Sequence, residues 1–403
     1  MPELSRRALL RGAGFAALVA GLPPVAGRTS AESRAVLRSQ PFRSGELGYS
    51  CYRTPGLAIT AAGTVLAFCG GRLDNCRDEG NIDVLLRRSV DGGRSWGPLQ
   101  VIADDGSNPC KIPVPVVLAS GRILLLWMWN AAVQREADRG LRHLRLTVSD
   151  DDGRSWAPSR DITEQVRLAG WKPWSGIGPG HGIVKRLAPN AGRIVVPARH
   201  SVANRGSRSH LLLSDDGGLS WRVGAIASAG PSNECTVAEL GDGSLMLNSR
   251  SRGGQRLVSI SRDGGETMAS SALDPQLIEP RNGCQASLLT YAFGPQRQAT
   301  LLFANPVDRQ HRTNGRIRVS RDNGRHWSRG FGTDPSLGAF SGYSDLARFS
   351  DGSVALLLES GAAFEKSRGE ERRRNRRALA GRSDRRHDGI TFLRVPFALI
   401  AAA

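Results

Sequence analysis

The chain has 403 residues, of which 40% are hydrophobic and 23% are charged. These values are ordinary for globular proteins, so the chain can bury a large core and wholesale disorder is excluded. Its 48 glycines and 21 prolines follow no collagen period, and they indicate many tight turns between short strands. We therefore expect an all-β protein.

The charge balance is strongly basic. Lysine and arginine number 55 against 37 acidic residues, a net charge of +18, which by itself would raise nucleic acid or an anionic membrane as a partner. Only four of the basic residues are lysines, and GC-rich coding produces such an arginine bias without selection for binding. The basic residues form no stripe with interleaved aromatic residues, so we do not expect nucleic-acid binding.

Residues 1–31 have the pattern of an export signal. Arg6 and Arg7 precede an uncharged run from Gly12 to Gly27, and small residues follow it. This resembles a twin-arginine signal peptide, with an uncleaved membrane anchor as the alternative. In either case the body of the protein leaves the cytoplasm, and we expect it to be secreted or at the cell surface.

A second uncharged stretch covers residues 54–71. It contains Pro55 and four glycines, which favours strand, turn and strand over a spanning helix. We expect no membrane span in the mature protein, and a monomer.

The six cysteines of an exported chain can form up to three disulfides, and the sequence leaves fifteen pairings open. There is no CxxC pair or Cys/His cluster, so we expect no structural zinc.

Five copies of the pattern S-x-D-x-G-x-x-W, or a near variant, recur at intervals of 47 to 65 residues. They are SVDGGRSW from Ser89, SDDDGRSW from Ser149, SDDGGLSW from Ser214, SRDGGETM from Ser261 and SRDNGRHW from Ser320. In each copy the aspartate can accept hydrogen bonds from turn amides, and the glycine two places on can take a positive φ. Apolar segments flank each copy, so each copy should join two antiparallel strands.

The length of this repeat suits one four-stranded propeller blade, and the mature chain is long enough for six of them. The pattern resembles the Asp-box (BNR) repeat. The resemblance implies that the box aspartates are structural and face away from the active site. We expect a six-bladed β-propeller of four-stranded antiparallel blades over residues 40–403.

Other motifs lie between the boxes. Cys51-Tyr52-Arg53-Thr54-Pro55 is similar to the Y-R-I-P motif of bacterial exo-α-sialidases, with Thr54 in place of an aliphatic residue. The further motifs occur in the order of that family. They are GGR with Arg72, RDEGNID with Asp78, SNECTVAEL with Glu234, LNSR with Arg250, GRIRVS with Arg318, GYS with Tyr343 and LLLESG with Glu359.

The resemblance implies a glycosidase that removes terminal α-linked sialic acid from glycans, glycoproteins or glycolipids without a metal or organic cofactor. Arg53, Arg250 and Arg318 would bind the ionised carboxylate of the sugar, because guanidinium groups bind carboxylates in a bidentate manner. Glu359 would hold Arg53, and Arg72 would help to hold the O4 of the sugar ring.

The implied mechanism retains the anomeric configuration through a covalent tyrosyl-glycoside. Sialidases with a tyrosine nucleophile are the exception among glycosidases, most of which use two carboxylates. Tyr343 would be that nucleophile, and Glu234 would take its proton, because free tyrosine ionises only near pH ~10. Asp78 would protonate the leaving oxygen and then activate water.

Some assignments have rivals. Glu79 competes with Asp78 for the acid/base role, and His181 is expected to organise its glycine-rich loop. The acidic residue that often precedes a proline near the sugar O4 is missing, and only Asn108 offers an amide there. Residues 127–129, or Trp171 and Trp174, could form an apolar wall for the N-acetyl methyl, with core packing as the alternative for most of them.

Two other functions fit the same motifs. They are a catalytically inactive propeller that binds sialoglycans, and a related enzyme that acts on another nonulosonic acid or transfers the sugar. Residues 364–388 form a strongly basic stretch, which we interpret as an exposed insertion. Residues 390–400 have the length and apolar content of a last strand that completes the ring.

Overall fold

The computed structural model describes residues 35–131, 140, 142–202, 206–251, 253–333, 340–361 and 387–403. The predicted leader over residues 1–31 lies outside these ranges, as does the predicted basic insertion except for its last two residues. Within the described ranges, no helix is long and apolar enough to cross a membrane.

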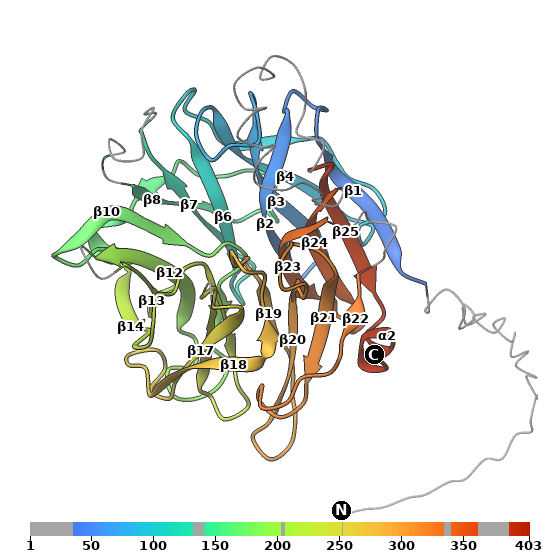
Figure 1. The fold of residues 1–403 in the computed structure, drawn as a ribbon. Coiled ribbons are helices and arrows are strands. Elements are labelled where there is room, and N and C mark those ends of the chain that lie inside the picture. Colours follow the sequence, from blue (N-terminus) through green and yellow to red (C-terminus); the bar gives the residue numbers. More distant parts are fainter. Residues whose placement is uncertain are drawn as a thin grey trace, which may run out of the picture. The chain divides into compact units, whose positions relative to one another are not determined.

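Six antiparallel sheets are arranged as blades around a central axis (Figure 1), which confirms the predicted six-bladed propeller. Blade 1 contains β2 (Cys51–Ile59), β3 (Val65–Arg72), β4 (Ile82–Ser89) and β5 (Gln100–Ala103). Blade 2 contains β6 (Cys110–Val117), β7 (Ile123–Trp129), β8 (His143–Ser149) and β9 (Arg160–Asp161), and a 3-10 helix, η3 (Thr163–Val166), follows it. Blade 3 contains β10 (Trp171–Ile177), β12 (Ile194–Val202), β13 (Gly206–Ser214) and β14 (Arg222–Ile226), with β11 (Ile183–Val184) paired to β12.

The remaining blades follow the same plan. Blade 4 contains β15 (Cys235–Glu239), β16 (Leu245–Ser249), β17 (Gln255–Ser261) and β18 (Ser270–Ile278). Blade 5 contains β19 (Ser287–Phe293), β20 (Ala299–Pro306), β21 (Gly315–Ser320) and β22 (Phe331–Gly332). Blade 6 contains β23 (Phe340–Arg348), β24 (Val354–Gly361), β25 (Gly389–Val395) and β1 (Leu37–Arg43).

The ring is closed by β1, the first strand of the described residues. β1 pairs with β25 in antiparallel register, Leu37 opposite Arg394, so blade 6 joins both ends of the propeller. The propeller begins at Leu37, three residues before the expected boundary at residue 40. The expected last strand over residues 390–400 is only partly correct, because β25 ends at Val395 and a short helix, α2 (Phe397–Ala401), follows Pro396.

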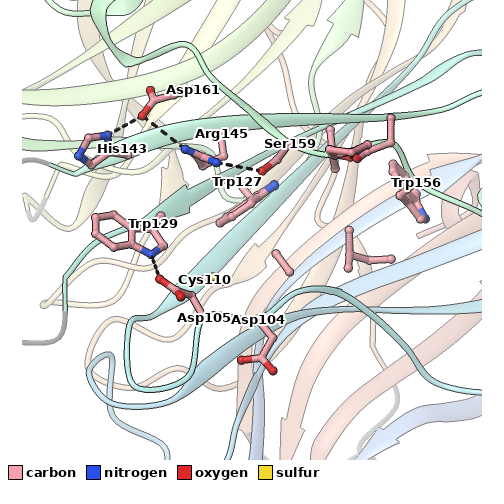
Figure 2. A pocket seen from close by; sticks show the side chains of 15 residues that line it. Asp104, Asp105, Cys110, Trp127, Trp129, His143, Arg145, Trp156, Ser159 and Asp161 are labelled. Carbon is pink, nitrogen blue, oxygen red and sulfur yellow. Dashed lines mark hydrogen bonds and ion pairs between the residues drawn. The ribbon is translucent and has the colours of Figure 1, made fainter.

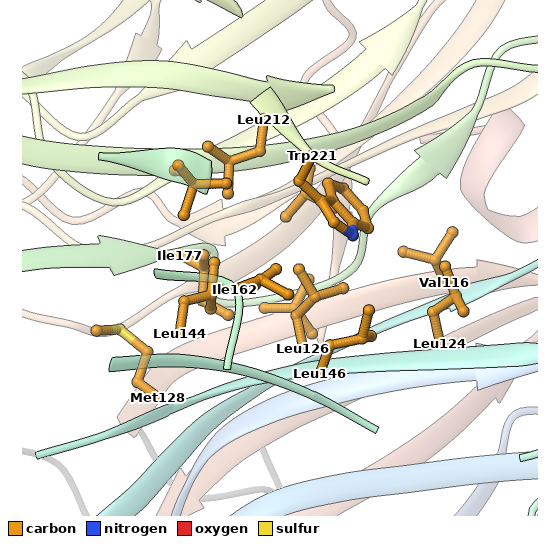
Figure 3. Packing of buried hydrophobic residues seen from close by; sticks show 14 of the residues in the cluster. Val116, Leu124, Leu126, Met128, Leu144, Leu146, Ile162, Ile177, Leu212 and Trp221 are labelled. Carbon is orange, nitrogen blue, oxygen red and sulfur yellow. The ribbon is translucent and has the colours of Figure 1, made fainter. Parts of the chain in front are cut away.

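The hydrophobic core is divided into wedges between neighbouring blades. Strand β7 illustrates the arrangement, because its side chains alternate between two wedges. Leu124, Leu126 and Met128 pack toward blade 3 in the cluster of Figure 3, whereas Leu125 and Trp127 pack toward blade 1. The inner strands of a blade are therefore buried on both faces of the sheet.

Each of the five boxes forms the predicted turn, and each joins the third and fourth strands of its blade. In the box of blade 2, Asp151 Oδ1 accepts hydrogen bonds from the amides of Arg154 (3.0 Å) and Ser155 (2.9 Å). Gly153 has a φ of +75°, and Leu66 of blade 1 lies 3.1 Å from where its Cβ would be. The boxes thus fold the turn and seal the seam with the preceding blade.

Candidate active site

Strand direction gathers the candidate residues at one end of the propeller. Inner strands begin, and second strands end, at the end of the ring opposite the box turns. Arg53 stands at the beginning of β2 and Glu234 directly precedes β15, while Arg72 ends β3 and Arg250 directly follows β16. Tyr343 lies in a register shift of β23 between Ser341 and Ser344. Such bulges redirect side chains out of the sheet.

Tyr343 and Glu234 form a buried pair. The Tyr343 hydroxyl donates a hydrogen bond to Glu234 Oε1, and the two residues are only 6% and 7% exposed. Arg250 Nη1 lies 2.7 Å from Glu234 Oε2 and 3.3 Å from the Tyr343 oxygen. The backbone carbonyl of Asn282 accepts a further hydrogen bond from Arg250. A carboxylate is therefore in place to take a proton from the phenol.

Glu359 ties the first and last blades together beneath this pair. Its Oε1 accepts hydrogen bonds from Arg53 Nε (3.2 Å) and from the Thr54 amide (2.9 Å). Its Oε2 accepts one from the Tyr343 amide at 3.2 Å. The predicted pairing of Glu359 with Arg53 is present, and the same carboxylate also positions the backbone of Tyr343.

Asp78 lies on the loop between β3 and β4 and meets two arginines. Its Oδ1 is 2.9 Å from Arg72 Nη2 and 3.7 Å from Arg53 Nη1. The Asp78 side chain is 67% exposed, whereas that of Arg72 is 2% exposed. A disulfide between Cys51 and Cys76 joins this loop to the start of β2. Asp78 is thus an accessible carboxylate held at the mouth of the site.

The third predicted arginine, Arg318, is not brought to this cluster. It belongs to the third strand of blade 5 and donates to the backbone carbonyl of Gln276 in blade 4. Third strands lie away from the axis and run toward the box turns, so a side chain in the middle of β21 cannot reach the inner end.

Arg312 takes the place predicted for Arg318. It lies on the loop after β20, at the end where second strands finish. Its guanidinium carbon is 5.1 Å from the centre of the Tyr343 ring, and that of Arg53 is 5.5 Å away. Arg53, Arg250 and Arg312 therefore surround Tyr343.

Lys111 is a site residue that the sequence reasoning missed. It is 4% exposed, and its Nζ donates to the Asp78 carbonyl oxygen at 2.8 Å. The sequence does contain a signal for this residue. In Lys111-Ile112-Pro113, a lysine stands where Arg53-Thr54-Pro55 has an arginine. Thr54 and Ile112 both have positive φ, 59° and 58°, and both inner strands shift register there.

Asn108, the amide considered for O4 recognition, instead donates to Asp105 Oδ2 at 3.0 Å. The His181 ring lies 2.7 Å from Asp345 Oδ1, and Asp345 also accepts hydrogen bonds from the Leu57 amide and the Ser287 hydroxyl. His181 therefore belongs to an axial network that joins blades, as expected for a residue that organises its loop.

Electrostatics separate the roles of the acidic groups. Burial alone would raise the pKa of Glu234, but the charges of Arg250 and Arg199 lower it to about 2. Burial and the charge of Glu234 raise the pKa of Tyr343 above that of free tyrosine. Against the effect of burial, Arg72, Arg53 and Lys111 hold the pKa of Asp78 below its usual range. At neutral pH, both carboxylates are ionised and the phenol keeps its proton.

Comparisons with known proteins identify the family of this chain. The BNR repeat-like domain family matches residues 63–356. An exo-alpha-sialidase of Aspergillus fumigatus is 30% identical over 344 residues, which cover 78% of this chain and 80% of the relative. The chain belongs to the sialidase family. A sialidase of Micromonospora viridifaciens is 33% identical over 80% of this chain but only 52% of its own length, so this chain spans about half of that relative.

Solved sialidase structures share the fold. The Hadza microbial sialidase Hz136 superposes with a TM-score of 0.74 at 27% identity, covering 90% of this chain and 69% of the other. A leech intramolecular trans-sialidase gives the same TM-score at 18% identity, covering 91% of this chain and 71% of the other. The second likeness supports the propeller fold alone.

Proposed function

We propose that this member of the sialidase family is an exo-α-sialidase that cleaves terminal α-linked sialic acid from glycans, glycoproteins or glycolipids. The proposal rests on one observation above all. A buried tyrosine is hydrogen-bonded to an ionised glutamate and lies among three guanidinium groups. Three cations around one tyrosine suit a small substrate with a carboxylate next to its reacting carbon.

In the proposed first step, the Tyr343 oxygen forms a bond to the anomeric carbon as the glycosidic bond breaks. Glu234 takes the phenolic proton, and Asp78, which would take up a proton from solvent once the substrate is bound, gives that proton to the departing oxygen. In the second step Asp78 takes a proton from water, whose oxygen bonds to the anomeric carbon. The tyrosyl bond breaks, and Glu234 returns the proton to Tyr343. Two inversions give net retention.

Arg53, Arg250 and Arg312 would hold the substrate carboxylate during both steps. Because Tyr343 would lose its proton only in the enzyme–substrate complex, no permanent anion lies next to the substrate carboxylate. Glu234 stays ionised until it accepts the phenolic proton, because Arg250 is paired with it at 2.7 Å. Glu359 would keep Arg53 and the Tyr343 backbone at a fixed spacing.

The decisive experiment compares hydrolysis of a fluorogenic sialoside by the wild-type protein and by Tyr343→Phe. We expect kcat to fall on the order of 10³-fold or more. Tyr291→Phe is the matched control, because Tyr291 donates to the Gly352 carbonyl and has no contact with the cluster. Binding of a sialoside by wild-type protein without turnover would instead favour a glycan-binding propeller.

Retention is tested separately by proton NMR. The first sialic acid released should be the α anomer, before mutarotation. Mass spectrometry of protein treated with a slow mechanism-based fluorosialoside should place the added mass on the peptide that contains Tyr343. Release of the β anomer first would contradict the tyrosyl-glycoside.

We also propose that residues 1–31 direct export, so the enzyme would meet its substrates outside the cytoplasm. Replacing Arg6 and Arg7 by lysine in a host with a twin-arginine system should retain the protein inside the cell. Unchanged export of that variant would contradict the twin-arginine assignment.

A further inference from the structure

A pocket lies between the outer strands of blades 1 and 2, apart from the residues around Tyr343. Its volume is about 740 Å³, within the range of about 300–1,000 Å³ typical of small-molecule sites. Residues of β5, β7, β8 and β9 line it. Arg53, Arg250 and Arg312, the three arginines around Tyr343, do not. We call it the outer pocket, defined by Asp105, Trp127, Trp129, His143, Arg145 and Asp161, which Figure 2 shows with their neighbours.

We propose that the outer pocket binds a neutral pyranose sugar of a glycan, as a non-catalytic site. The ring faces of pyranoses are apolar and their edges carry hydroxyls, so they suit aromatic surfaces bordered by polar groups. Three tryptophans line the pocket, Trp127, Trp129 and Trp156. Trp127 and Trp129 are two residues apart on β7 and therefore project from the same face of the sheet.

An unpartnered donor supports a ligand. Trp127 is 5% exposed, and its Nε1 is buried and has no hydrogen-bond partner. Such a group costs free energy unless something accepts its proton. Trp129, by contrast, donates to Asp105 Oδ2 at 2.6 Å. A sugar hydroxyl in the pocket would provide the missing acceptor for Trp127.

Polar groups are already oriented around the tryptophans. Asp161 Oδ2 lies 2.6 Å from the His143 ring and 3.6 Å from Arg145 Nη1, as the dashed lines in Figure 2 show. Arg145 also donates to the Ser159 hydroxyl at 3.3 Å. Hydrogen bonds from Trp129 and Asn108 lower the pKa of Asp105. Burial alone would raise the pKa of Asp161, but hydrogen bonds from Thr163 and His143 lower it, so both carboxylates accept hydrogen bonds at neutral pH.

The charges select against an acidic sugar. Asp104, Asp105 and Asp161 face the pocket against one permanent cation, Arg145. The carboxylate of a sialic acid would therefore be repelled there. A galactose or N-acetylhexosamine residue, the kind of neutral sugar that remains when a charged cap is removed, meets no such repulsion. The outer pocket would hold the enzyme on glycans whether or not the proposed hydrolysis is correct.

The test is calorimetric titration of the full chain with methyl β-galactoside and methyl β-N-acetylglucosaminide, with α-methyl sialoside as the anionic arm. We expect saturable binding of at least one neutral sugar. Trp129→Ala and Trp127→Phe should each weaken this binding about tenfold or more. Trp127→Phe removes only the hydrogen-bond donor and part of the ring. Trp327→Ala is the matched control, because Trp327 is a half-buried box tryptophan outside the pocket.

Thermal melts of every variant show whether it remains folded, and Asp105→Asn offers a gentler change if an alanine variant is unstable. Turnover of a small fluorogenic sialoside should be unchanged in Trp129→Ala, which separates this site from the proposed catalytic one. No saturable binding of either neutral sugar would overturn the proposal. Binding that persists in Trp129→Ala, or that prefers the sialoside and depends on Trp129, would overturn it equally.

Discussion

Asp78 Oδ1 lies 2.9 Å from Nη2 of Arg72, a guanidinium that is itself almost completely buried. The proposed acid is thus held as a carboxylate until a substrate arrives. Burial, followed by the charge of Arg53, lowers the pKa of Arg72 to about 10. Arg72 therefore remains a cation at neutral and acidic pH. A substrate carboxylate bound to Arg53 would offset one of the charges that keep Asp78 ionised and would raise its pKa.

Arg72→Gln should therefore raise the pKa of Asp78. With less cationic charge nearby, the protonated acid persists to higher pH in the enzyme–substrate complex, so the alkaline limb of kcat for a natural sialoside should move upward. Arg77→Gln, an exposed arginine of the same loop, serves as the control and should leave the limb in place. A limb that moves downward in Arg72→Gln would contradict the role of Asp78 as acid.

The two candidates for the third arginine form a matched pair. Arg312→Lys should lower kcat/KM by about 10- to 100-fold, because one charge-assisted bidentate contact is worth about 1.5–3 kcal/mol. Arg318→Lys should stay within about twofold of wild type, since Arg318 donates a hydrogen bond to the Gln276 carbonyl of the neighbouring blade, away from Tyr343. Steady-state kinetics on one fluorogenic sialoside decide between them. The reverse result would restore Arg318 to the site.

Local chemistry explains what the sequence could predict. A box such as Ser149 to Trp156 folds its own turn, so its position and its two strands follow from eight residues. The order of the sialidase-like motifs along the chain can likewise be recognised without knowledge of contacts. Arg318 was misassigned because Arg312 and Arg318 are only six residues apart, and only the strand boundary at Pro306 decides which one faces the axis. The disulfide pairing depends on how the β3–β4 loop folds back onto β2, and the outer pocket depends on how two blades pack, and no local pattern specifies either.

Glu359→Gln should weaken both folding and substrate binding. The glutamate is fully buried and accepts hydrogen bonds from Arg53 and from two backbone amides. A glutamine keeps one acceptor, turns an NH2 group toward one of these donors and leaves Arg53 with only the more exposed carboxylate of Asp78, 3.7 Å away. Breaking such a buried pair costs about 3–5 kcal/mol. Denaturant unfolding should show this loss, and KM should rise. An unchanged unfolding midpoint would show that Arg53 finds another partner.

Glu234 should make the fold sensitive to acid. Its pKa falls from 4.5 to about 2 on folding, so its contribution to stability is complete above pH 4.5 and is lost as the pH falls toward 2. Glu234→Gln should therefore flatten the decline of melting temperature between pH 4.5 and pH 2. Glu164→Gln, an exposed carboxylate in η3, is the control and should follow the wild-type curve. An equally steep decline in Glu234→Gln would contradict the lowered pKa.

The Asp-box aspartates should affect stability and leave chemistry alone. Asp151 accepts the Arg154 and Ser155 amides, whereas its neighbour Asp150 makes an exposed pair with Arg122. Asp151→Ala should cost about 1–2 kcal/mol, as for a lost helix cap, and should lower the melting temperature by a few degrees. Asp150→Ala should melt like wild type. In both variants kcat on a fluorogenic sialoside should be unchanged, because the box turn lies at the opposite end of the ring from Tyr343. A large loss of kcat in folded Asp151→Ala would place the box in the site.

The disulfide between Cys51 and Cys76 joins the strand that carries Arg53 to the loop that carries Asp78. Each cysteine precedes its functional residue by two positions, and the Cys76 carbonyl accepts a hydrogen bond from Arg72 at 2.5 Å. Closing a loop of this length stabilises a fold by about 3 kcal/mol. Cys76→Ser should therefore lower the melting temperature. It should also slow hydrolysis of a natural sialoside more than that of an aryl sialoside, because an aryl leaving group needs less help from the acid. Reductant should reproduce both effects in the wild type and add nothing in Cys76→Ser. If the reduced wild-type protein gains two titratable thiols but keeps its activity on the natural substrate, the Asp78 loop keeps its position without the disulfide.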